Sequence, residues 1–328
     1  MKKLFCVLLS VILILACFPG CSKKSDGYRV AIVQQLEHSS LDEIRLAVEA
    51  RLQALAQEKG IAITVESFNG QGDSTLLNQI GTQVVSEGYD AIIPIATLAA
   101  QCMVTAAEGT DIPIIYAAIS DPEAAGLTGL PKVTGTSDAL NTPFILDMML
   151  AVQPDVKTVG LLYSNSEANS LAPIAEAKAY LEGKGIACIE KTGTTPDEII
   201  TAANSLVGRV DAVFTPTDNT VMSSESAVAE ILTAAGIPHY TGADSFVTSG
   251  AFTTCGVNYT ELGTATADMA MDILLGGDTP AYQVMDGGII TVNTETAAAL
   301  GLDYSVSISK EQQQDQKSHW KCQNLFYQ

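Results

Sequence analysis

Residues 89–101 (YDAIIPIATLAAQ) read as a buried strand that runs directly into the start of a helix. Residues 210–221 (VDAVFTPTDNTV) repeat this layout, and in both stretches a polar residue, Thr97 or Asp218, follows the opening aspartate by seven positions. A short apolar run bounded by turn signals is typical of a strand that is covered on both faces, as in the centre of a parallel sheet. The repeat therefore predicts two similar lobes in one chain.

Strands alternate with amphipathic helices on both sides of each stretch, and this alternation indicates βαβ units around a parallel sheet. Further strands are expected at residues 28–34, 62–68, 112–118, 133–137, 158–163, 187–190 and 238–241. Residues 221–235 are expected to form one continuous helix. The predicted fold class is α/β, with two doubly wound parallel-sheet lobes.

Three segments are expected to cross between the lobes and to form a hinge. A strand at residues 251–257 leads toward the first lobe, the helix 259–275 packs there, and residues 287–292 return to the second lobe. The predicted domain boundaries follow from these crossings. The first lobe comprises residues 28–139 and 257–283, and the second comprises residues 140–256 and 284–304.

The two ends of the chain are expected to lie outside the lobes. Two lysines and an apolar run, too short to span a bilayer comfortably, make residues 1–21 a targeting segment. The run ends at Cys21 and the polar tether 22–27 follows at once, which resembles a bacterial lipoprotein signal with Cys21 lipidated. There are two alternatives: lipidation at Cys17, or a plain secretory signal without lipidation. All three readings predict an extracytoplasmic protein, and in the first two a lipid would anchor it to the cell membrane. The polar, Gln-rich tail 305–328 is expected to be disordered.

Composition excludes several classes of function. The chain has 328 residues, 17 Lys and Arg against 37 Asp and Glu, and a net charge of −20. A nucleic-acid surface requires a basic patch, so no nucleic-acid partner is expected. The sequence has no G-x-G-x-x-G after a strand, no P-loop, no G-x-S-x-G elbow and no zinc-type His/Glu spacing. We therefore expect a monomer without enzymatic activity, cofactor or metal.

Five motifs in register resemble the substrate-binding lipoproteins of bacterial ABC importers. They are QQLEHSSLDEI, IATLAAQ, AAISDP, LLYSNSEANS and TPTDNT, within a similarity that extends from Tyr28 to about Leu302. The chain is most similar to the tryptophan/tyrosine-type members, which have a type I periplasmic-binding-protein-like fold. The resemblance implies two lobes that close over a small amino acid, aromatic or apolar, and deliver it to a membrane permease served by a cytoplasmic ATPase.

Ligands of open α/β sheets bind beyond the carboxyl ends of the strands, where N–H groups of helix N-termini point outward. The carboxylate of an amino acid would suit Thr97 and the N–H groups after it, assisted by the turn from Ala118 to Asp121. Its ammonium group would suit Asp218 and Asp244. The remaining candidate ligand contacts are His38, Ser39, Ser40, Ala96, Asn165, Asn169 and Asn219.

Each candidate also has a structural alternative. Thr97, Asp121 and Asp218 fit helix or turn caps, the asparagines fit turns, and His38 fits a loop surface. Asp244 departs from the family pattern, in which a small uncharged residue is expected, so it favours a different ligand. Two other functions stay open: a binding protein that reports to a receptor, and an importer component for a solute other than an amino acid.

Overall fold

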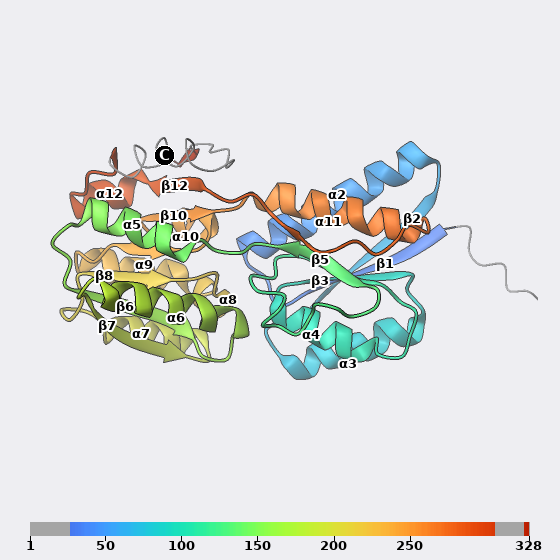
Figure 1. Cartoon of the computed structure of the whole chain (residues 1–328), viewed down its shortest axis with the longest axis horizontal. Helices are drawn as coiled ribbons and strands as arrows, with labels where there is room; N and C mark the ends of the chain where they lie inside the picture. The colour runs from blue at the N-terminus through green and yellow to red at the C-terminus, as the bar shows by residue number, and fades with distance from the viewer. Residues whose placement is uncertain (1–26, 306–324, 328) are drawn as a thin grey trace, which may run out of the picture.

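The computed structural model describes residues 27–305 and 325–327 (Figure 1). The predicted targeting segment with Cys21, most of the tether and most of the predicted tail lie outside the described residues. The last part of the tail is described at Leu325–Tyr327, which forms strand β13. Within these ranges, no helix combines the length and the apolar character needed to cross a bilayer.

The first lobe is built on a six-stranded parallel sheet within the described residues, in the order β11-β5-β4-β3-β1-β2. Its strands are β1 (Gly27–Gln34), β2 (Ala62–Asn69), β3 (Ala91–Ile95), β4 (Ile114–Tyr116), β5 (Val133–Ser137) and β11 (Gln283–Val284). Successive residues of the central strand β1 face opposite sides: Val30 and Ile32 join one buried cluster, and Ala31 and Val33 join another. A strand covered on both faces explains its continuous apolar run.

The second lobe is built on a seven-stranded sheet in the order β13-β12-β10-β9-β8-β6-β7, counted over the same described ranges. Its strands besides β13 are β6 (Thr158–Ser164), β7 (Ala187–Gly193), β8 (Ala212–Thr215), β9 (His239–Thr241), β10 (Thr253–Gly256) and β12 (Ile289–Asn293). The neighbours from β7 to β10 pair in parallel, whereas β12 runs antiparallel to β10. The prediction of parallel sheets therefore holds for both lobes, with two reversed strands, β12 and β13, added at one edge of the second.

Helices cover both faces of each sheet (Figure 1). In the first lobe, α2 (Ser39–Lys59) and α11 (Tyr259–Leu274) pack side by side on one face, and α3 (Ser74–Glu87) and α4 (Thr97–Ala106) cover the other. The second lobe carries α5 (Thr142–Val152), α6 (Ala168–Gly183), α7 (Pro196–Asn204), α8 (Asn219–Met222), α9 (Glu225–Ala234), α10 (Asp244–Thr248) and α12 (Thr294–Leu300). Burial of an aliphatic side chain stabilises by about 1.5–3 kcal/mol, so these two-sided cores are the main source of stability.

Two local predictions are wrong. The single helix expected at residues 221–235 is two helices, α8 and α9, because the backbone of Ser224, with φ −117° and ψ 6°, departs from helical geometry. The short helix α10 was not predicted, since five residues are too few to show a periodicity.

The chain crosses between the lobes three times, as Figure 1 shows. The crossings lie between β5 and α5, between β10 and α11, and between β11 and β12. The strand predicted at residues 251–257 belongs to the second sheet as β10, and the crossing follows it. This confirms the predicted three-segment hinge.

Candidate ligand-binding site

A cavity lies between the lobes, where the carboxyl ends of the two sheets face each other. In the first lobe, each parallel strand ends at the same edge, so the loops after β1, β3, β4 and β5 meet there. The loops after β8 and β9 approach from the second lobe. The cavity is lined by His38, Ser40, Leu41, Ala96, Thr97, Ala118, Ser120, Asp138, Asn169, Thr217, Asp218, Asn219, Met222, Ala243, Phe246 and Tyr259.

Most of the residues proposed from the sequence are brought together on this lining. They are His38, Ser40, Ala96, Thr97, Ala118, Asn169, Asp218 and Asn219. The other four do not line the cavity: Ser39, Asp121, Asn165 and Asp244. Ser39 and Asn165 are exposed, and the carboxylate of Asp121 accepts a hydrogen bond from the N–H of Ala124 at 2.9 Å, as a turn cap does.

Asp244 lies near the cavity but not on it. It is the first residue of α10 and is half-buried. Loss of hydration and the neighbouring Glu43 carboxylate raise the pKa of Asp244 to about 6. The Asp244 carboxylate also lies close enough to Tyr259 to raise the pKa of that phenol.

The first-lobe loops hold two residues in unusual backbone conformations. Ala96 has φ 74° and Ala118 has φ 57°, in the region that favours glycine. Such conformations cost about 1–3 kcal/mol each and are found mostly where a function requires the geometry. The strained Ala96 places Thr97 at the N-terminus of α4, whose N–H groups and dipole favour an anion. One of these N–H groups, that of Leu98, is bonded to Oε1 of Gln35 at 3.1 Å.

A buried carboxylate, Asp138, lies just after β5. Its Oδ1 accepts a hydrogen bond from Ser120 at 3.0 Å, and its Oδ2 accepts one from the phenol of Tyr259 at 3.2 Å. Burial raises the pKa of Asp138, and the two hydroxyl donors oppose this effect. Two bonds leave acceptor capacity on a carboxylate, so Asp138 can receive a ligand donor.

Asp218 is a second buried carboxylate at the cavity, and it is paired with the buried carboxylate of Glu167. Its Oδ2 accepts from Ser164 N–H at 2.7 Å and from the Ser170 hydroxyl at 2.6 Å, and its Oδ1 caps α8 through Val221 N–H at 2.9 Å. Burial and the nearby Glu167 carboxylate raise the pKa of Asp218 to about 7. The predicted cap role of Asp218 is therefore present, and the residue also lines the cavity. Most of its acceptor capacity is used by the protein.

Glu167 belongs to the same pair and holds the start of α8. It accepts hydrogen bonds from the N–H and side-chain amide of Asn219 at 3.2 and 2.7 Å. It also accepts from the N–H and hydroxyl of Thr220, both at 3.0 Å. Burial raises the pKa of Glu167, whereas these donors lower it.

Polar side chains join the two lobes directly across the cleft. The bridging pairs are Gln35 with Glu167 at 3.5 Å, His38 with Asn219 at 3.0 Å, Ser120 with Thr217 at 3.0 Å, and Ser40 with Ser245. The structure is therefore a closed arrangement of the lobes. A wider groove that shares Thr97 and Asn169 with the cavity leads to the surface.

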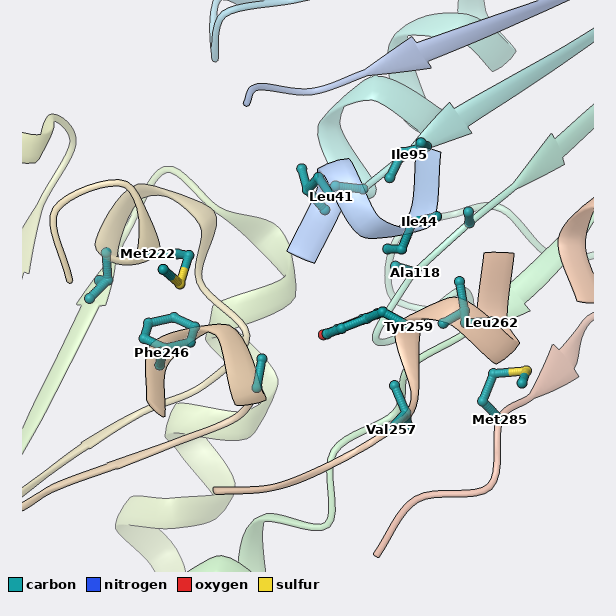
Figure 2. Close-up of a cluster of buried hydrophobic side chains, with 14 of the residues drawn as sticks. Leu41, Ile44, Ile95, Ala118, Met222, Phe246, Val257, Tyr259, Leu262 and Met285 are labelled. Atoms are coloured by element: carbon teal, nitrogen blue, oxygen red, sulfur yellow. The ribbon is translucent and has the colours of Figure 1, made fainter. Parts of the chain in front are cut away.

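One side of the cavity is apolar. Leu41 comes from the first lobe, Met222 and Phe246 come from the second, and Tyr259 stands at the hinge. Figure 2 shows the Tyr259 ring extending from the start of α11 into the space between the lobes, with its hydroxyl toward the side of Met222 and Phe246. An apolar wall with a few polar groups is typical of a small-molecule site.

Several lining residues were missed in the sequence. Ser120, Thr217 and the nearby Glu167 lie inside the motifs AAISDP, TPTDNT and SNSEANS, so their position after strand ends was an available signal. Asp138 and Tyr259 adjoin hinge crossings, and Phe246 lies on the unpredicted helix α10. No local pattern distinguishes such residues from ordinary loop and core residues.

Two lobes on a three-crossing hinge, closed over a cavity of mixed polarity, define a solute-binding protein of the type I periplasmic-binding-protein-like fold. The model of the family described as "ABC transporter substrate binding protein" matches residues 29–316. The chain belongs to this family.

Individual relatives agree with the family. The tyrosine-binding protein of Clostridioides difficile is 31% identical over 323 residues, covering 92% of this chain and 93% of the relative. The solved ABC domain in complex with L-Trp from Streptococcus pneumonia is 30% identical, with a TM-score of 0.80 over 87% of this chain and 98% of the other. The ligand-free, open structure of a substrate-binding protein with adhesive properties from Clostridium difficile is 34% identical, with a TM-score of 0.64 over 84% and 95%.

Proposed function

We propose that this protein captures an aromatic or other apolar amino acid in the cavity between its lobes, outside the cytoplasm, and delivers it to the permease of an ABC importer. The proposal includes attachment to the cell membrane through a lipid on Cys21 and the domain boundaries given by the three crossings. It keeps the eight predicted residues on the cavity lining as ligand contacts and adds Asp138 and Tyr259.

The buried Asp138 is the observation that carries the proposal. Among the described residues that line the cavity there are carboxylates but no lysine or arginine. A buried carboxylate favours a ligand that brings a positive charge, because an ammonium group replaces the hydration that Asp138 has lost. Asp138 is preferred to Asp218 as the acceptor, since it accepts two protein hydrogen bonds whereas Asp218 accepts three.

The carboxylate of an amino-acid ligand would bind at a separate position in the cavity. With no cation on the lining, a ligand carboxylate is best held by neutral donors, and Thr97 with the N-terminus of α4 provides them. Ala118 also lines the cavity, and it follows β4, the strand next to β3. In the sequence it lies between Thr97 and Asp138. The arrangement suits a zwitterion more than a sugar, whose recognition needs no such charge separation.

The apolar wall supports an aromatic or apolar side chain. Burial of an aromatic side chain of roughly 150–250 Å² stabilises by about 4–6 kcal/mol at roughly 25 cal/mol per Å². Two relatives, described as binding tyrosine and as complexed with L-Trp, agree with this class of ligand. The TM-score is higher with the L-Trp complex, 0.80, than with the open structure, 0.64, which supports closure around the ligand as the bound state.

Two experiments test the proposal. Thermal-shift screening of the chain from residue 22 onward against the twenty amino acids and a set of sugars should show stabilisation by aromatic amino acids and none by sugars. Uptake of the best ligand should fall in a strain from which the gene is deleted. Unchanged uptake with intact binding would favour a protein that reports to a receptor.

A further inference from the structure

The imidazole of His38 contains a buried polar atom without a partner. Nδ1 of His38 is shielded from solvent and has no hydrogen-bond partner among the described residues, although the residue as a whole is only half-buried. His38 also lines the cavity. Buried polar atoms are nearly always paired, so an unpaired one on a cavity indicates a place for a ligand group.

The hydrogen-bonding role of this nitrogen is fixed from the second lobe. Glu167 accepts a hydrogen bond from the Asn219 side-chain amide at 2.7 Å, so the NH₂ group of Asn219 must face Glu167. The amide oxygen Oδ1 of Asn219 then faces Nε2 of His38 at 3.0 Å. An amide oxygen can only accept, so Nε2 of His38 carries the proton.

The other nitrogen is then an acceptor when the ring is neutral. Burial lowers the pKa of His38, against the weaker opposing effects of Asn219 and Asp42, so the neutral ring is favoured. A neutral imidazole protonated on Nε2 has a lone pair on Nδ1. A residue that lines the cavity therefore carries a buried, unpaired acceptor, which a hydrogen-bond donor of a ligand would satisfy.

We propose that His38 is a specificity-determining residue, whose Nδ1 accepts a hydrogen bond from a ring N–H or O–H of an aromatic amino acid. The inference rests on the proposed function, with the ammonium group of the ligand at Asp138. His38 and Leu41 are three positions apart at the start of α2, and Asn219 and Met222 are three positions apart on α8. His38 thus lies beside the apolar wall, where the side chain of the ligand would pack.

A ligand that lacks the donor should bind more weakly. It leaves Nδ1 unpaired in the closed cleft, and sites built to hydrogen-bond a substrate group discriminate strongly against analogues without it. Tryptophan should therefore bind at least about tenfold more tightly than 1-methyltryptophan, and tyrosine more tightly than phenylalanine.

Calorimetric titration of the chain from residue 22 with these two ligand pairs tests the proposal. In His38→Phe, which keeps a ring but removes both nitrogens, the preference should fall to within about threefold, mainly through weaker binding of the donor-bearing ligand. Ser39→Ala, at an exposed neighbour, should keep the wild-type preference. Equal affinity within each pair in the wild type, or a preference that survives His38→Phe, overturns the role of His38 alone. Absence of binding by any amino acid overturns the proposed function itself.

A second measurement does not depend on the variant. The ¹⁵N shifts of the His38 ring in the ligand complex at neutral pH should show a protonated Nε2 and an unprotonated Nδ1. The Nδ1 signal should differ between complexes with tryptophan and 1-methyltryptophan. A proton on Nδ1, or identical signals in both complexes, contradicts the proposal.

Discussion

The phenol oxygen of Tyr259 donates a hydrogen bond to Oδ2 of Asp138 across 3.2 Å, and the two residues adjoin different crossings of the hinge. Asp138 directly follows β5, and Tyr259 begins α11. The bond therefore fixes the carboxylate relative to both crossings at the point where the cavity meets the hinge. Under the proposed function, it links the acceptor of the ligand ammonium group to the segments that must move when the lobes open.

Replacement of Asp138 by asparagine should weaken an amine-bearing ligand by at least about tenfold, because a charge-assisted hydrogen bond of about 1.5–3 kcal/mol is lost. Calorimetry would measure the change. The matched control is Asp121→Asn, which removes a carboxylate from a turn outside the cavity lining and should change the affinity by less than about twofold. Equal affinities in Asp138→Asn and the wild type would remove Asp138 from the site.

Asp218→Ala should lower the free energy of unfolding by about 2 kcal/mol, because three buried donors lose their acceptor. Chemical denaturation without ligand measures this effect. A loss below about 0.5 kcal/mol would contradict the capping role of Asp218. The proposal that Asp218 also contacts the ammonium group requires, in addition, a tenfold loss of affinity in the folded variant.

The Glu167–Asp218 pair should make stability fall as the pH rises. The pKa of Asp218 is about 7 in the folded chain, above its ordinary value, so the folded state holds a proton that the unfolded state releases. The contribution is complete below the ordinary carboxyl pKa of about 4 and is lost as the pH rises through about 7. Glu167→Gln removes the neighbouring charge and should make the fall in unfolding free energy between about pH 5 and 8 smaller, while the part that comes from burial of Asp218 remains.

A surface carboxylate provides the control for this pH dependence. Lys178 bonds Glu190 at 2.7 Å and lowers the pKa of Glu190, so Glu190 titrates below the tested window. Glu190→Gln should therefore keep the wild-type slope. A slope that is unchanged in Glu167→Gln would show that the pair does not titrate as a unit.

Gly263 allows α11 to approach α2 closely. A Cβ there would lie 2.7 Å from the carbonyl oxygen of Ile44 and 2.8 Å from Cβ of Ala47. Gly263→Val should destabilise the first lobe by about 1–3 kcal/mol through overpacking. Gly183→Ala, in a helix with nothing within 4 Å of the new Cβ, should instead stabilise by about 0.5 kcal/mol. Similar melting temperatures for the two variants would contradict the close packing of these helices.

The sequence predicted the two-lobe fold well, because that fold depends on local signals. Apolar runs followed by polar strand ends located the two lobes, and they placed Thr97 and Asp218 on one cavity. The same signals do not show which hydrogen bonds a side chain makes. The three donors to Asp218 come from Ser164, Ser170 and Val221, which only the folded loops bring together.

The rest of the site depends on contacts between distant segments. Asp138 and Tyr259 are brought to the cavity by the hinge, and His38 receives its hydrogen-bonding role from Asn219 in the other lobe. Phe246 lies on a five-residue helix that shows no periodicity. Such features arise from tertiary packing, which a single sequence read segment by segment does not contain.

Calorimetric titration of the chain from residue 22 with L-tryptophan and L-tyrosine is the decisive measurement of amino-acid binding. We expect saturable binding of one molecule per chain, with a dissociation constant of about 1 μM or tighter for at least one of them. Absence of a binding signal with these and the other natural amino acids, on a chain shown to be folded, would contradict it.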